Sequence, residues 1–172
     1  MVTRPRPLAR KGEPMPSVTS ILLVDRRPGG DQPPADCLRL PLRADERCSA
    51  RGHRRSACGR DLLLQLPRGA VLEPGELLLS EDGQVQVLVE AAPEPLLRVR
   101  SQKPLALLQA AYHLGNRHVA MELHSDELLI LEDSVLEDLL RQRGLEVQRL
   151  TAPFRPEAGA YASHPHAHHP SH

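Results

Sequence analysis

Apolar residues occupy every second position in several short stretches of the first half of the chain. A β-strand with one buried face requires such alternation, because successive side chains point to opposite faces. The alternating residues are Leu38, Leu40 and Leu42, then Leu62, Leu64 and Leu66, then Val85, Val87 and Val89. Turn signals separate these stretches, including the loop at 28–34 and the hairpin dipeptide Asp82-Gly83. With further apolar runs at 18–24 and 77–79, the pattern predicts an all-β domain over residues 18–92.

The pattern changes after the proline-rich step at 91–95, where we place a domain boundary. Beyond it, periodicity predicts two helices and four strands, the strands at 96–100, 119–123, 128–131 and 145–150. The resulting order, β-α-β-β-α-β, is typical of a ferredoxin-like domain, here over residues 93–151. The predicted fold class is therefore α+β: an N-terminal all-β domain, a ferredoxin-like domain and a disordered histidine-rich tail.

Both predicted helices carry signals at their ends. For the first, Ser101 is the expected N-cap, Pro104 lies in the first turn and Gly115 ends the helix. For the second, Ser134 and Glu137 have the spacing of a capping box, in which hydroxyl and carboxylate each accept a backbone N–H at the helix start. The residues that recur at helical spacing in the first helix are Leu105, Leu108, Ala111 and Tyr112.

Composition excludes several classes of protein. The 172 residues contain 22 basic and 22 acidic side chains, and this balance argues against a nucleic-acid or membrane-surface binder. No apolar run reaches the roughly 20 residues of a membrane span or resembles a signal peptide, so we expect a cytoplasmic protein. Three cysteines without a C-x-x-C pair indicate reduced thiols. With one Phe, two Tyr and no Trp, the core is expected to consist mainly of leucine.

The two ends of the chain lack any core-forming period. Residues 1–17 are proline-rich and basic, which predicts a flexible leader, and residues 152–172 are predicted to form a tail. The tail histidines are His164, His166, His168, His169 and His172. Neutral imidazole binds Ni²⁺, Cu²⁺ and Zn²⁺, so this set predicts labile metal binding that weakens below about pH 6.5.

Two histidines at the end of the first predicted helix are further candidates. His118 follows Gly-Asn-Arg at the junction between helix and strand, and His113 lies one turn and more before it. Either could be a metal ligand or a merely structural residue. The residues alone do not choose between them.

Several motifs resemble one known family. They are Tyr-His-Leu-Gly-Asn-Arg-His at 112–118, Val-Leu-Glu-Asp-Leu-Leu at 135–140 and the run from 152 to 161 before a histidine-rich end. The segments at 64–69 and 75–78 match more loosely. Together these motifs resemble the UreE family of urease accessory proteins.

The resemblance implies a nickel metallochaperone that delivers Ni²⁺ to urease apoprotein. It implies a homodimer whose N-terminal domain is similar to the peptide-binding part of Hsp40 chaperones. The histidine that matches His118 binds nickel between the two subunits, and tail histidines supplement the site. The implied partners are the accessory GTPase UreG and, through it, the UreD–UreF–urease complex.

One position departs from the family pattern, and one alternative function stays open. Where some members have His-Asp-His, this chain has Glu132, Asp133 and Ser134, so the extra imidazoles are absent. The alternative is a metal storage or buffering protein that uses the same histidines without delivery. The affinity order of divalent metals by itself favours copper over nickel and zinc. Because no nucleophile or general base is positioned beside the tail, we expect no enzyme activity.

Overall fold

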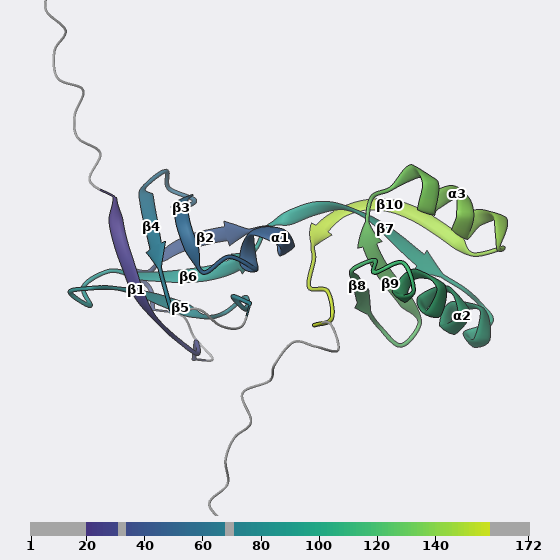
Figure 1. Cartoon of the computed structure of the whole chain (residues 1–172), viewed down its shortest axis with the longest axis horizontal. Helices are drawn as coiled ribbons and strands as arrows, with labels where there is room; N and C mark the ends of the chain where they lie inside the picture. The colour runs from purple at the N-terminus through teal and green to yellow at the C-terminus, as the bar shows by residue number, and fades with distance from the viewer. Residues whose placement is uncertain (1–19, 31–33, 68–70, 159–172) are drawn as a thin grey trace, which may run out of the picture.

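Two β-sheets, one from each half of the chain, form two lobes that a short link between strands connects (Figure 1). The computed structural model describes residues 20–30, 34–67 and 71–158. The predicted leader at 1–17 and all five tail histidines lie outside these residues. The N-terminal β-rich domain and the C-terminal domain with helices confirm the predicted α+β class.

The first sheet has six strands in the order β2-β6-β5-β1-β4-β3. Its elements are β1 (Ile21–Arg27), β2 (Leu38–Leu42), α1 (Ala44–Arg47), β3 (Arg51–Arg55), β4 (Asp61–Gln65), β5 (Leu77–Ser80) and β6 (Gln86–Ala91). The predicted hairpin at Asp82-Gly83 is confirmed, because β5 and β6 pair antiparallel and Gly83 has a positive φ. The single-turn helix α1 is a departure from the predicted all-β domain.

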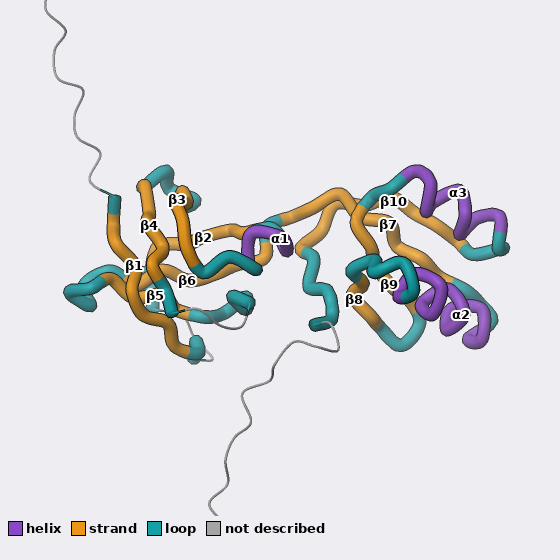
Figure 2. The backbone as a smooth tube through the Cα atoms, viewed as in Figure 1, coloured by secondary structure: helices purple, strands orange, loops and turns teal. Residues whose placement is uncertain are grey.

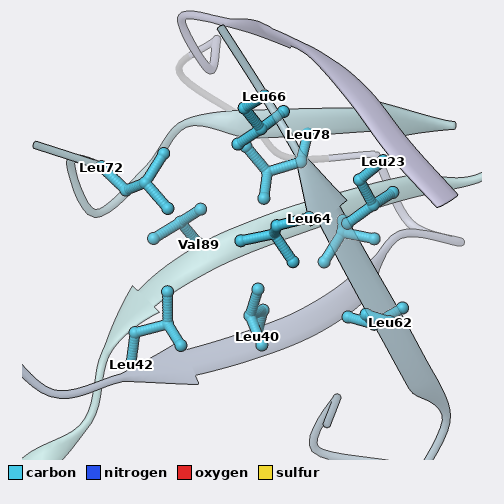
Figure 3. Packing of buried hydrophobic residues seen from close by; sticks show 10 residues of the cluster. Leu23, Leu40, Leu42, Leu62, Leu64, Leu66, Leu72, Leu78 and Val89 are labelled. Carbon is cyan, nitrogen blue, oxygen red and sulfur yellow. The ribbon is translucent and has the colours of Figure 1, made fainter. Parts of the chain in front are cut away.

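Leucine fills the core of this sheet, as composition led us to expect. The side chains in Figure 3 come from five of the strands and the flanking loops and point toward one another. The sheet curls around them, since the amide of Ala57 after β3 donates to the carbonyl of Arg39 on β2, at the other edge. The fully buried leucines are Leu23, Leu40, Leu62, Leu64, Leu66, Leu72 and Leu78.

The second sheet has four antiparallel strands in the order β10-β7-β9-β8. Its elements are β7 (Pro93–Arg100), α2 (Pro104–Gly115), β8 (Met121–Leu123), β9 (Glu127–Leu131), α3 (Ser134–Gln142) and β10 (Glu146–Pro153). Both helices lie against this sheet (Figure 2). They pack on one face of it, where Ala110, Leu114 and Leu140 meet Leu97 and Ile130. The closer likeness to a ferredoxin-like domain stays a prediction.

The capping box predicted at the start of α3 is wrong. Asp133, not Ser134, is the N-cap, and its carboxylate accepts from the amides of Val135 and Leu136. The buried carboxylate of Glu137 turns away and accepts from the guanidinium of Arg149 on β10, at 2.6 Å. This hydrogen bond holds the pKa of Glu137 below its ordinary value.

The predicted start of α2 is also corrected. The N-cap is Lys103, which makes no side-chain cap, and Pro104 occupies the first turn as expected. The hydroxyl of Ser101 accepts from the amide of Lys103 instead, so it orders the loop before the helix.

The predicted tail begins too early. Strand β10 continues through Pro153, and Phe154 after it is fully buried. Phe154 packs against Leu96 and Leu129 on the sheet face opposite the helices, and Ala44 of α1 packs on the same cluster. Residues at 152–154 therefore belong to a core that both domains share.

Two remaining expectations concern cysteines and membranes. Cys37, Cys48 and Cys58 are free thiols, as predicted. None of the helices in the described parts of the chain has both the length and the apolar character needed to cross a membrane.

Candidate metal centre

His118 lies in the turn between α2 and β8, in a left-handed backbone conformation. Its φ is 56°, and no other non-glycine residue among those described has a positive φ. The amide of His118 donates to the carbonyl of Gly115 at 2.9 Å, and that of Val119 to the carbonyl of Leu114 at 3.1 Å. These two bonds define a Schellman motif with His118 at the C′ position, where glycine is preferred.

Helix α3 ends in the same motif with a glycine at the matching position. The amide of Gly144 donates to the carbonyl of Arg141 and that of Leu145 to the carbonyl of Leu140, at 2.9 and 3.2 Å. Gly144 has a φ of 76°. In both motifs the next residue, Val119 or Leu145, packs in the core under the helices. The two turns differ in that His118 occupies the left-handed position where α3 has a glycine. A residue with a side chain in this conformation costs about 1 kcal/mol or more.

The same comparison corrects the predicted role of Gly115. Gly115 is the last residue of α2, but its backbone does not adopt the left-handed conformation of a glycine stop. The chain reverses three residues later, at His118. A strained residue that could have been glycine points to a use for its side chain.

The imidazole of His118 is exposed and makes no hydrogen bond or ion pair with any described residue. The other candidate, His113, is half-buried, and its ring packs edge-to-face on Tyr112 with centroids 5.6 Å apart. Packing therefore engages His113 and leaves His118 accessible. Within the described residues, no group of three or more His, Cys, Asp or Glu side chains is placed to hold a metal.

The root of the histidine-rich tail lies beside β8, close in sequence to His118. The amide of Glu157 donates to the carbonyl of Met121 at 2.7 Å, and the amide of Arg155 donates to the carboxylate of Glu122, also at 2.7 Å. Glu122 also contacts the imidazole of His124 at 3.2 Å. The sequence alone did not predict that residues 155–157 lie against β8. The single Phe between prolines at 153–156 could have indicated an ordered segment there.

The positions that replace the His-Asp-His set have structural partners. Glu132 forms an ion pair with Arg149 at 2.8 Å, and Asp133 caps α3. Neither carboxylate is directed at His118 by any contact in the described parts of the chain.

An apolar face of α2, the helix that precedes His118, lies exposed. Leu105, Leu108 and Tyr112 are 66, 68 and 68% exposed, although their helical spacing resembles that of a core-facing stripe. A shallow groove lined by Leu108, Leu123 and Leu128 runs between α2 and the β8–β9 turn. Large exposed apolar patches on a folded domain mark interaction surfaces.

The fold and site define a two-domain, strand-rich α+β protein with an accessible histidine near the root of a histidine-rich tail. Two family models match it: "UreE urease accessory protein, N-terminal domain" over residues 24–92 and "UreE urease accessory protein, C-terminal domain" over residues 94–172.

Curated relatives agree with these matches. The urease accessory protein UreE of Parasynechococcus marenigrum is 55% identical over 147 residues, which cover 86% of this chain and 97% of that protein. UreE of Synechococcus sp. strain CC9311 is 62% identical over 76% of this chain and 84% of its own length. UreE of Burkholderia lata is 46% identical over 75% of this chain and 62% of its own length. The chain therefore belongs to the UreE family of urease accessory proteins, as its motifs predicted.

The strain at His118 is testable without metal. We expect His118→Gly to raise the free energy of unfolding by about 1 kcal/mol, because glycine tolerates the left-handed conformation, whereas His118→Ala keeps the strain. Urea unfolding in the presence of a chelator measures both variants. Gly144→Ala is the matched control and should destabilise by about 1 kcal/mol. Equal stability of His118→Gly and His118→Ala would contradict this account of the turn.

Proposed function

We propose that this protein is a nickel metallochaperone that binds Ni²⁺ as cargo and delivers it to urease apoprotein during urease assembly. Membership of the UreE family of urease accessory proteins supports a role in that assembly. Relatives are named as accessory proteins of urease rather than as urease itself, which agrees with a non-enzymatic role.

The observation that carries the proposal is the strained, exposed His118 beside the root of the tail. The turn costs stability with histidine and would not with glycine. Its imidazole is accessible and has no partner among the described residues. A metal ion would use the nitrogen that the fold leaves free.

The tail starts close enough for its histidines to join this site. Glu157 is bonded to Met121, three residues beyond His118, and His164 lies seven residues beyond Glu157. Seven extended residues span at most about 25 Å. The proposed ligands are therefore His118 with members of the tail set His164, His166, His168, His169 and His172. Zn²⁺ and Cu²⁺ suit the same donors.

We further propose that the protein acts as a homodimer through the exposed face of α2. The face formed by Leu105, Leu108 and Tyr112 lies on the helix whose C-terminal turn holds His118, so a dimer built on α2 would have both turns near the ends of the paired helices. On a two-fold axis each residue is presented twice, so a single histidine position would supply two ligands.

The remaining parts of the proposal follow from the family. Partners are the accessory GTPase UreG and the UreD–UreF–urease complex, and the setting is the cytoplasm. The N-terminal domain would serve as the peptide-binding unit that the family resemblance implies.

Calorimetric titration with nickel tests the metal ligands. We expect His118→Ala to weaken the tightest site at least tenfold, equivalent to about 1.4 kcal/mol of binding free energy. A chain ending at Ala162 should bind fewer ions, because it lacks all five tail histidines. His113→Ala is the matched control and should bind as wild type. If both His118→Ala and the shortened chain bind nickel as wild type does, these ligands are wrong.

Introducing one charged side chain on the exposed face of α2 tests the proposed dimer surface. Leu108→Glu should shift the protein toward monomer in size-exclusion chromatography with light scattering, because a buried unpaired carboxylate disfavours association. Val135→Glu on α3 is the control, since Val135 is likewise exposed, at 74%. A dimer that survives Leu108→Glu, or a wild-type monomer, would contradict the proposed surface.

A further inference from the structure

Residues 154–157, here called the strap, carry the chain from one edge of the second sheet to the other. The strap leaves β10, an edge strand, and reaches β8, the opposite edge strand. Three strand spacings separate these edges, about 14 Å. Figure 1 shows the strap in yellow, running from the end of β10 toward β8. Without the strap, the tail would start on the far side of the sheet from β8.

The second domain holds the strap at three points. Phe154 is fully buried against Leu96 and Leu129, on the face that the helices leave free. The amide of Arg155 donates to the carboxylate of Glu122, and the amide of Glu157 donates to the carbonyl of Met121. These contacts fix the path of the strap as far as Glu157.

A fourth contact with the strap comes from the first domain. Nη2 of Arg47, the last residue of α1, donates to the carbonyl of Phe154 at 2.7 Å. Arg47 is only 3% exposed, so this is a charged hydrogen bond inside the junction between the domains. The start of α1 is fixed as well, because the amide of Ala44 donates to the buried carboxylate of Glu94 at 2.8 Å.

The guanidinium of Arg47 is buried, and its bonding is directed at the strap. Nε and Nη1 of Arg47 are buried and have no hydrogen-bond partner in the part of the chain that the structure describes. A buried cation with unused donors costs free energy, and an apolar side chain of similar size is often neutral or stabilising there. Among the described residues, the one side-chain hydrogen bond of Arg47 goes to the strap. This bond ties the carbonyl of Phe154 to the end of α1.

We propose that Arg47 is a positioning residue for the metal site: through the strap, the first domain places the root of the histidine tail beside His118. This inference rests on the proposed function, in which tail histidines and His118 share nickel. Fixing the root near His118 raises the effective concentration of tail imidazoles there, so the shared site binds more tightly than separate ligands would. Releasing the strap would move the point at which the tail begins from β8 back toward β10.

Arg47→Met tests the inference in the full chain, because methionine fills the volume but cannot donate to Phe154. Amide hydrogen exchange at Arg155 and Glu157 should quicken about tenfold as the strap loosens. The loss of nickel affinity caused by His118→Ala should shrink about threefold or more in the Arg47→Met background, since the tail is then less coupled to His118. Arg47→Lys keeps one donor and should restore both readouts.

Two further variants make the test specific. Arg43→Met, in the same segment but exposed and without a contact to the strap, should behave as wild type. Glu122→Ala removes one of the two bonds between the strap and β8 without touching the first domain, and should reduce the coupling in the same direction even if Arg47→Met fails to fold.

The outcomes separate this inference from the proposed function. A normal His118→Ala penalty in wild type that stays unchanged in both Arg47→Met and Glu122→Ala overturns the inference alone. A His118→Ala variant that binds nickel as wild type does overturns the proposed function, and the inference with it.

Discussion

The burial of Phe154 is the interaction on which the arrangement of both domains depends. It is the only phenylalanine of the chain, and it joins Leu96, Leu129 and Ala44 from three separate elements. Its side chain fills the sheet face that the helices leave open, and its carbonyl receives the buried guanidinium of Arg47. One residue thus closes a core, links α1 to the second sheet and fixes where the tail begins. Removing a buried phenylalanine costs about 3–5 kcal/mol in typical cores.

The second constraint is the shared ending of α2 and α3. Both helices turn through the same pair of hydrogen bonds and bury the following residue, Val119 or Leu145, in one cluster. With Gly144 this turn is relaxed, whereas with His118 it is strained. The turn leaves the imidazole of His118 exposed to solvent after the end of α2. The left-handed backbone at His118 lowers local stability, and the imidazole nitrogen is accessible. Such local strain is common at functional sites.

The spacing of apolar residues along the sequence, together with turn-forming residues, allowed much of this fold to be predicted. Alternating leucines such as Leu40 and Leu64 mark strands because one sheet face is buried, and the pattern needs no knowledge of neighbours. Features that depend on distant partners could not be read in this way. Glu137 had the spacing of a capping box, but Arg149, twelve residues on, provides a stronger partner for its carboxylate. Asp133, and not Ser134, is therefore the N-cap of α3.

In the candidate site, too, some features could be predicted from the local sequence and others could not. His118 could be named from its motif, while its left-handed backbone could not, because Gly115 three residues earlier was the more plausible helix stop. The apolar spacing of Leu105, Leu108 and Tyr112 predicted a helix correctly, but not that this face is exposed. Arg47 and Phe154 lie 107 residues apart, and no local pattern connects them.

The central claim is delivery, and nickel-dependent activation of purified urease apoprotein tests it most directly. With a fixed, limiting amount of nickel, the account predicts that the wild-type protein raises urease activity above that with nickel alone, and that His118→Ala raises it less. A storage or buffering protein would compete for the metal. Activity lowered in proportion to the wild-type protein added would therefore contradict the account.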